Sequence, residues 1–219
     1  MPTQTLLMHL GALQPDSVIS LRPSFDELTP SRYKDGEYRL RRYSKICFDH
    51  GRVSVLPTEA FVQSGDINEF QGDVVRIYDN LSDQALHSEG MAQICQSFVD
   101  ACELPSVCQI EIHQMRIIAK QDSAPAESAP EGIHQDGFDY VGVFTIQRYN
   151  QSGGELMIWR DKQSPKPVST LTPKAGEYCI VNDRTLWHSA SAVAVGDQDQ
   201  VGYWDLLVLT ANNPNLSSD

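Results

Sequence analysis

The sequence predicts a mainly β domain with flanking helices, of the α+β class, in which a sandwich or barrel follows a mixed N-terminal half. Three observations lead to this prediction. Seven short runs rich in β-branched and aromatic residues follow Pro105, and glycine, proline, asparagine or aspartate separates most of them. One segment with helical periodicity precedes them. The 219 residues can form one sizeable core, and a single domain is favoured over two.

The N-terminal half, roughly residues 1–104, is expected to support the β core within one domain of residues 1–219. The segment RLRRYSKICFDHGRVSVLP (39–57) contains short strand-like runs broken by glycine and proline. The segment LSDQALHSEGMAQICQSFVDACEL (81–104) repeats apolar residues at intervals of three and four. That spacing predicts one helix, with Ser82 or Asp83 as its N-cap.

The core, roughly residues 105–211, contains the predicted strands, which cover residues 107–119, 140–149, 155–159, 167–173, 177–183, 186–193 and 202–210. Strands in this number and at this spacing are typical of an all-β sandwich or barrel. The segment KQDSAPAESAPEG (120–132) contains too much proline, serine and alanine for a strand. It is predicted to be a mobile loop that leads into His134.

Composition and charge narrow the classes of function. A net charge of −12 argues against nucleic acid, whose phosphates require a basic surface. No apolar run approaches the ~20 residues of a membrane span, and the first residues lack the features of a signal peptide. Five cysteines without paired spacing indicate a reducing cytoplasm and neither a disulfide framework nor a zinc site. We therefore expect a cytoplasmic protein with a small-molecule substrate, and a homodimer is one assembly that the sequence allows.

A metal-ligating pattern stands where the loop meets the strand that follows it. His134 and Asp136 are two residues apart, so their side chains point to the same face of an extended backbone. His188 lies in a later strand-like segment, LWHSAS. Two imidazoles and one carboxylate form the facial triad of non-haem Fe(II) oxygenases. The alternative is that His134 and Asp136 cap a turn while His188 packs in the core.

Longer stretches around these residues occur in a characteristic order. They are RLRRYSKICFD, IEIHQMRIIA, GIHQDGFDYV, RYNQSGGELMIW, KAGEYCIVNDRTLWHSASAV and GYWDLLVLT, and together they extend over nearly the whole chain. In this respect the chain resembles the 2-oxoglutarate/Fe(II)-dependent dioxygenases. Within them it resembles the bacterial group that includes L-isoleucine dioxygenase and hydroxylates free amino acids.

The resemblance implies both a fold and a reaction. The fold is a double-stranded β-helix, a jelly-roll or cupin-like barrel of two antiparallel sheets with the metal at one open end. His134, Asp136 and His188 would hold Fe(II), which 2-oxoglutarate and O2 also bind. The implied reaction hydroxylates a small molecule, such as a free L-amino acid or related carboxylate, and releases succinate and CO2. The alternatives are desaturation, sulfoxidation or cyclisation on the same scaffold, or a barrel that binds metal or ligand without turnover.

The last strand departs from the pattern of this family. The resemblance implies an arginine near its start that pairs with the distal carboxylate of 2-oxoglutarate, but GYWDLLVLT has Trp204 there. An indole cannot form a fork of charge-assisted hydrogen bonds. Arg148, two residues before Asn150, is the predicted replacement unless it points to solvent at the strand end. Lys174 and Arg184 are weaker candidates, because both lie in turn-like segments.

Four further arginines have two interpretations each. Arg116 alternates with apolar neighbours, so it could bind a substrate carboxylate or form a structural ion pair. Arg39, Arg41 and Arg42 form a basic cluster in an acidic chain. For that cluster, a solvated or salt-bridged face is favoured over a ligand site.

Overall fold

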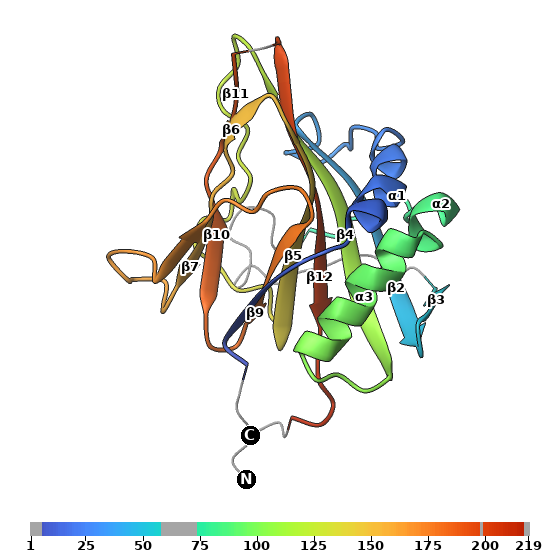
Figure 1. The fold of residues 1–219 in the computed structure, drawn as a ribbon. Helices are drawn as coiled ribbons and strands as arrows, with labels where there is room; N and C mark the ends of the chain where they lie inside the picture. Colours follow the sequence, from blue (N-terminus) through green and yellow to red (C-terminus); the bar gives the residue numbers. More distant parts are fainter. Residues whose placement is uncertain (1–5, 58–73, 198, 217–219) are drawn as a thin grey trace.

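Two antiparallel sheets and a short ribbon carry most of the chain, and helices cover one side of the larger sheet (Figure 1). The computed structural model describes residues 6–57, 74–197 and 199–216. The helices are α1 (Pro15–Phe25), α2 (Asp83–Leu86) and α3 (Glu89–Ala101). The strands are β1 (Met8–Ala12), β2 (Arg39–Asp49), β3 (Arg52–Val55), β4 (Val107–Lys120), β5 (Tyr140–Tyr149), β6 (Gln151–Gly153), β7 (Leu156–Trp159), β8 (Ser169–Leu171), β9 (Glu177–Asn182), β10 (Trp187–Ala190), β11 (Val193–Val195) and β12 (Val201–Ala211).

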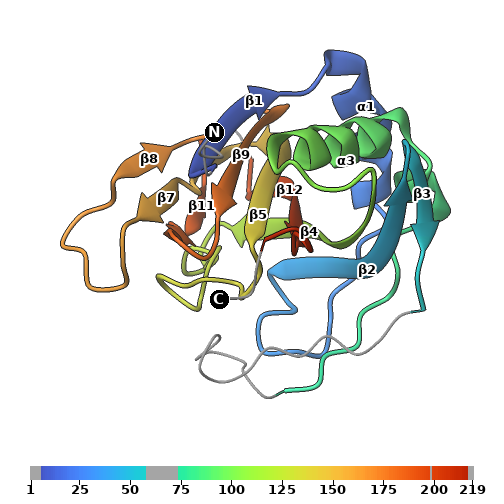
Figure 2. The same ribbon diagram turned by 90° about the horizontal axis from the view of Figure 1, so that it is seen from below.

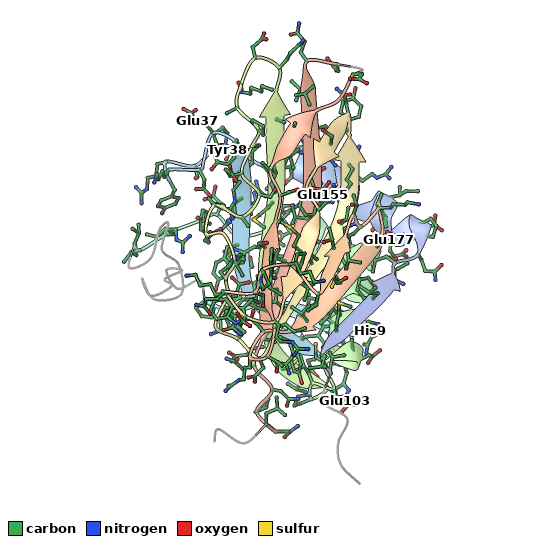
Figure 3. All side chains as sticks on the ribbon, turned by 90° about the vertical axis from the view of Figure 1, so that its left-hand side faces the viewer. His9, Glu37, Tyr38, Glu103, Glu155 and Glu177 are labelled. Carbon is green, nitrogen blue, oxygen red and sulfur yellow. The ribbon has the colours of Figure 1, made fainter. Side chains whose placement is uncertain are left out.

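The larger sheet has the order β1-β9-β5-β12-β4-β2-β3, the smaller sheet has the order β10-β7-β8, and β11 pairs with β6. All strand pairs among the described residues are antiparallel, the arrangement in which a short turn can join neighbouring strands. This arrangement is the double-stranded β-helix, so the predicted fold class is confirmed. The N-terminal strands extend the larger sheet at both edges, and Figure 3 shows His9 of β1 on one side and Tyr38, just before β2, on the other.

Each face of the larger sheet packs against a different layer. Along β12, Leu207 and Leu209 point toward the helices, whereas Trp204 and Leu206 point toward the smaller sheet. Side chains alternate between faces along a strand, so one strand serves two apolar clusters. Figure 2 shows α3 lying across the strands of this sheet on its helical side. No helix in residues 6–57, 74–197 and 199–216 is long and apolar enough to cross a membrane.

The segment predicted as one helix over 81–104 forms two helices. Ser82 caps α2, and its hydroxyl accepts a hydrogen bond from the backbone of Ala85 at 3.3 Å. Ser88 then caps α3 and accepts from the backbone of Met91 at 3.0 Å. A second N-cap therefore starts a new helix inside the periodic segment. The hydroxyl of Ser88 accepts a hydrogen bond from an N–H group of the first turn of α3, which has no partner within that helix.

Helix α1 and strand β1 are features that the sequence reading did not predict. Helix α1 contains Pro23, which argues against a helix in sequence, yet it buries Val18, Leu21 and Phe25. It approaches α3 so closely that a side chain at Gly90 would lie 2.2 Å from the backbone oxygen of Ser17. Tertiary packing, rather than local propensity, fixes this pair of helices.

A β-bulge in β5 changes which side chains face the interior of the barrel. In the pairing of β12 with β5, Asp205 pairs with Gln147 and the adjacent Leu206 pairs with Thr145. Ile146 is therefore an extra residue of β5 with no partner in β12. After the bulge, Arg148 pairs with Trp204 and lies on the inner side of the sheet.

Candidate active site

His134, Asp136 and His188 come together at one end of the barrel. One ligand atom from each lies within 4.8 Å of the others. His134 Nε2 is 3.7 Å from Asp136 Oδ1, and His188 Nε2 is 3.5 Å from Asp136 Oδ2. Two imidazole nitrogens and one carboxylate directed at a common point form a donor set that suits Fe(II).

The backbone holds the two histidines in register. The N–H groups of His134 and His188 each donate to the other residue's carbonyl, at 3.0 and 2.9 Å, which joins the loop to β10. Nδ1 of His134 lies 2.9 Å from the carbonyl oxygen of Gly132. A carbonyl only accepts, so Nδ1 carries the proton and Nε2 presents its lone pair to the cluster.

Asp183, which sequence reasoning did not single out, supports the loop that carries Asp136. Its Oδ2 accepts hydrogen bonds from the backbone N–H groups of Asp136, Gly137 and Phe138, at 2.8, 2.9 and 3.3 Å. Three successive N–H groups around one carboxylate oxygen form an anion-binding nest. The available signal was an aspartate directly after the buried strand EYCIVN, a position that reads equally well as a turn.

Buried negative charge around His188 makes the cluster attractive to a cation. His188 Nε2 lies 3.2 Å from Asp183 Oδ1, but neither atom has a hydrogen-bond partner within the described residues. Burial alone would lower the pKa of His188, yet the nearby carboxylates of Asp183 and Asp136 raise it above its ordinary value. A buried imidazole nitrogen without a partner and two adjacent carboxylates are the features that a divalent metal ion would satisfy.

The cluster opens into a cavity between the two sheets. The volume of this cavity is about 100 Å³, several times the ~10–15 Å³ that one water molecule requires, so it admits a small organic molecule. Most of the wall is apolar. Its charged side chains, apart from the triad, are Arg39, Arg41 and Glu131.

The position of Arg39 and Arg41 differs from the sequence prediction. Both lie on the inner face of β2 and line the cavity, whereas Arg42 points to the outer face and pairs with Glu27 at 3.1 Å. The solvated or salt-bridged face that we expected for all three therefore describes Arg42. Arg39 is also ion-paired, with Asp35 and Glu131, but it faces the cavity, as Arg41 does. Successive residues of a strand alternate between faces, and this alternation separates Arg41 from Arg42.

Trp204 forms part of the cavity wall, and its indole N–H donates to the hydroxyl of Thr145 at 3.1 Å. Arg148 stacks behind it, with its guanidinium carbon 4.3 Å from the centre of the indole ring. Within the described part of the chain, Arg148 does not line this cavity. Its guanidinium donates to the backbone carbonyls of Pro173, Gly153 and Gly154, at 2.8, 3.0 and 2.7 Å.

These contacts do not favour the predicted role of Arg148 as the anchor of a carboxylate. Burial lowers the pKa of Arg148 to about 10, so the group is charged at neutral pH, but its donors already point at carbonyl oxygens. The geometry indicates that Arg148 fixes Trp204 and the glycine turn before β7.

We expect Arg148→Ala to lower the free energy of unfolding by about 1–3 kcal/mol, because three carbonyls lose their donor. The dissociation constant for 2-oxoglutarate should change less than about threefold, measured by anaerobic titration of the Fe(II) form. Lys174→Ala is the control, since Lys174 is exposed on the neighbouring turn. A rise of about tenfold or more in the Arg148 variant alone would identify Arg148 as the carboxylate anchor.

Arg116 lies on the opposite face of the larger sheet from the cavity. Its guanidinium donates to both carboxylate oxygens of the buried Asp205, at 2.6 and 2.8 Å, and to Asp26 at 3.0 Å. It also stacks over the ring of Tyr203, with 4.4 Å from the guanidinium carbon to the ring centre. Of the two interpretations left open by the sequence, the structure shows the ion pair.

Comparisons with solved structures agree with this fold. A bsmA homolog from Methylobium petroleophilum PM1 is 24% identical with a TM-score of 0.74, and the match covers 93% of this chain and 83% of that one. IDO from Bacillus thuringiensis is 15% identical with a TM-score of 0.75, covering 95% and 94%. The Fe(II)/(alpha)ketoglutarate-dependent dioxygenase TqaL is 16% identical with a TM-score of 0.67, covering 95% and 79%. At such identities the likeness shows the fold. No curated protein matches the chain.

The fold and the ligand cluster together define a β-helix oxygenase of the non-haem iron type. The sequence model of the 2OG-Fe dioxygenase family matches residues 22–210, and the chain belongs to that family. It is accordingly a 2-oxoglutarate-dependent dioxygenase, and its cofactors are those of the family, Fe(II), 2-oxoglutarate and O2.

Proposed function

We propose that this dioxygenase hydroxylates a free L-amino acid or a closely related carboxylate, as in the group that includes L-isoleucine dioxygenase. The observation that carries the proposal is the position of the histidine–carboxylate cluster at the mouth of a cavity with one charged wall. A cavity of this kind, apolar apart from a few convergent polar groups, is typical of a site for a small organic molecule.

His134, Asp136 and His188 are the residues that would hold Fe(II). Nε2 of His188, which has no hydrogen-bond partner among the described residues, and the lone pair of His134 Nε2 support this assignment. When bound, Fe(II) and 2-oxoglutarate supply the oxidation, in which one atom of O2 enters a C–H bond and the other enters succinate as CO2 is released. An intact carboxylate at Asp136 favours hydroxylation, since related halogenases lack this ligand.

The remaining residues position the reactants and exclude water. Asp183 fixes the loop that carries Asp136, and the indole of Trp204 offers an apolar surface against which the cosubstrate would pack. Apolar side chains of β4, β5 and β12 line the cavity beyond the metal cluster, so bulk water is kept from the reacting C–H bond.

The proposal is tested in two stages with the intact protein. Anaerobic titration of Fe(II) and then 2-oxoglutarate should produce the metal-to-ligand charge-transfer absorption of a chelated keto acid. Aerobic assays with the apolar L-amino acids valine, leucine, isoleucine and methionine should then release succinate and yield a product that has gained one oxygen atom. We expect at least one of these amino acids to raise succinate release about tenfold over the rate without substrate.

The outcome also separates the alternatives. A product that has lost two hydrogens instead of gaining oxygen would indicate desaturation or cyclisation. Formation of the charge-transfer band without stimulation by any amino acid would contradict the substrate class and leave the dioxygenase chemistry standing. Absence of the band would indicate a barrel that binds ligand without turnover.

A further inference from the structure

The charged groups of the cavity gather on one wall. Arg39 and Arg41 project from β2, and Glu131 projects from the loop three residues before His134. Arg39 Nη1 lies 3.2 Å from Asp35 and 3.6 Å from Glu131. Both guanidinium groups and one carboxylate therefore face the same space as the metal cluster.

The guanidinium groups on this wall carry more hydrogen-bond donors than the described residues supply acceptors for. Nε of Arg39 is buried and has no hydrogen-bond partner among the described residues, although the residue is only 6% exposed. Arg41 forms no ion pair or hydrogen bond within those residues, and its guanidinium carbon lies 5.4 Å from the centre of the Tyr78 ring. A buried guanidinium with unused donors is costly unless an anion completes its hydrogen bonds, and a carboxylate matches the geometry of its fork.

Glu131 adds the opposite charge to the same wall. Burial alone would raise its pKa, but the guanidinium of Arg39 lowers the pKa of Glu131 to about 2, so it is ionised at neutral pH. An α-amino acid presents a carboxylate and an ammonium separated by one carbon, which is the pair of charges that neighbouring guanidinium and carboxylate groups complement.

The rest of the cavity is suited to a hydrocarbon side chain. The apolar groups that line it come from both sheets and include Met115, Ile117, Val141, Val143, Leu156 and Leu206. A ligand whose charges lie at one end and whose other end is aliphatic would satisfy the whole surface.

We propose that Arg39, Arg41 and Glu131 form the subsite for the head group of an apolar α-amino acid, with its carboxylate on the two guanidinium groups and its ammonium on Glu131. This inference rests on the proposed function and names the residues that recognise the substrate. The distal carboxylate of 2-oxoglutarate shares the chemistry of the carboxylate but brings no ammonium, so Glu131 would repel it.

The test measures binding to the anaerobic Fe(II)·2-oxoglutarate form by calorimetry, with L-valine, L-leucine, L-isoleucine and L-methionine as probes. For whichever probe binds wild type, Arg41→Met should raise its dissociation constant by about tenfold or more, while that of 2-oxoglutarate changes less than about threefold. Glu131→Gln should weaken the amino acid by a similar factor. The corresponding 2-hydroxy acid, which lacks the ammonium, should bind the Glu131 variant as well as wild type.

Arg42→Met is the matched control, because Arg42 neighbours Arg41 on β2 but points to the outer face. It should leave both dissociation constants at wild-type values. Circular dichroism of each variant checks that the fold is retained, and Arg41→Lys, which keeps the charge but loses the fork, should show an intermediate loss.

Three results would overturn the subsite. One is an Arg41→Met protein that binds amino acids as wild type does. Another is a variant that loses 2-oxoglutarate instead, which would assign the guanidinium groups to the cosubstrate. The third is wild-type protein that binds 2-oxoglutarate but none of the four amino acids. An amino acid that binds the Glu131→Gln variant as tightly as it binds wild type would contradict the role of Glu131 in the same way. Failure of wild type to bind Fe(II) and 2-oxoglutarate would instead contradict the assignment of the metal site.

Discussion

Replacing His134, Asp136 or His188 by alanine is expected to abolish specific Fe(II) binding and succinate release while the chain remains folded. Each variant removes one of three protein ligands, and the remaining two cannot hold the metal in the same geometry. The side chains are polar, line the cavity and contribute little apolar packing, so the free energy of unfolding should change by less than about 2 kcal/mol. Anaerobic metal titration and chemical unfolding measure the two effects separately.

His87→Ala provides the control for these variants. His87 is an exposed histidine at the end of α2, far in sequence from the cluster, and its loss should leave Fe(II) affinity unchanged. A His188→Ala protein that bound Fe(II) and turned over like wild type would contradict the assignment of the triad.

Asp183→Asn is expected to produce the second large effect, although Asp183 lies outside the triad. An amide has one acceptor oxygen, and its N–H₂ group takes the place of the other carboxylate oxygen. In one orientation the N–H₂ group faces the three backbone N–H donors, and in the other it faces His188. We expect the free energy of unfolding to fall by about 2–3 kcal/mol. Fe(II) affinity should fall by about tenfold to a hundredfold, because the loop that carries Asp136 loses its support.

Asp139→Asn separates the two effects. Asp139 is also a buried carboxylate of this loop, but it accepts hydrogen bonds from Arg184 and from the backbone of Asn213, the latter at 2.7 Å. Its loss should destabilise the protein while leaving Fe(II) affinity within about threefold of wild type. If both variants were destabilised and both kept wild-type Fe(II) affinity, Asp183 would have only a structural role.

The C-terminal strands were predictable because their local signals are strong and agree with one another. Short β-branched runs bounded by turn residues mark the strands from Val107 onward, and the structure has strands there. Helix α1 was not predictable from its own residues, because Pro23 contradicts a helix and only packing against α3 overrides it. Ser88, the second N-cap, is a residue type that often starts a helix, but the apolar pattern continues on both sides of it. The sequence therefore indicated one helix where the structure has two.

The cluster of His134, Asp136 and His188 was predictable from the sequence, whereas the faces of the arginines were not. Strand β4 is covered on one side by helices and on the other by the smaller sheet, so apolar residues occur on both faces and alternation does not show which face Arg116 takes. Asp183 meets its backbone partners 45 to 47 positions away along the chain, a contact that only the fold creates.

The bulge in β5 has a consequence for how relatives of this chain are aligned. On the N-terminal side of the bulge odd-numbered residues of β5 face the cavity, and beyond it Arg148 takes the inner side instead. In a homologue that lacks the extra residue, an ungapped alignment would place the side chain that corresponds to Arg148 one column earlier, opposite Gln147. Substitution patterns compared column by column would then contrast buried with exposed positions, so a gap belongs at Ile146 before any residue near Trp204 is said to be conserved or lost.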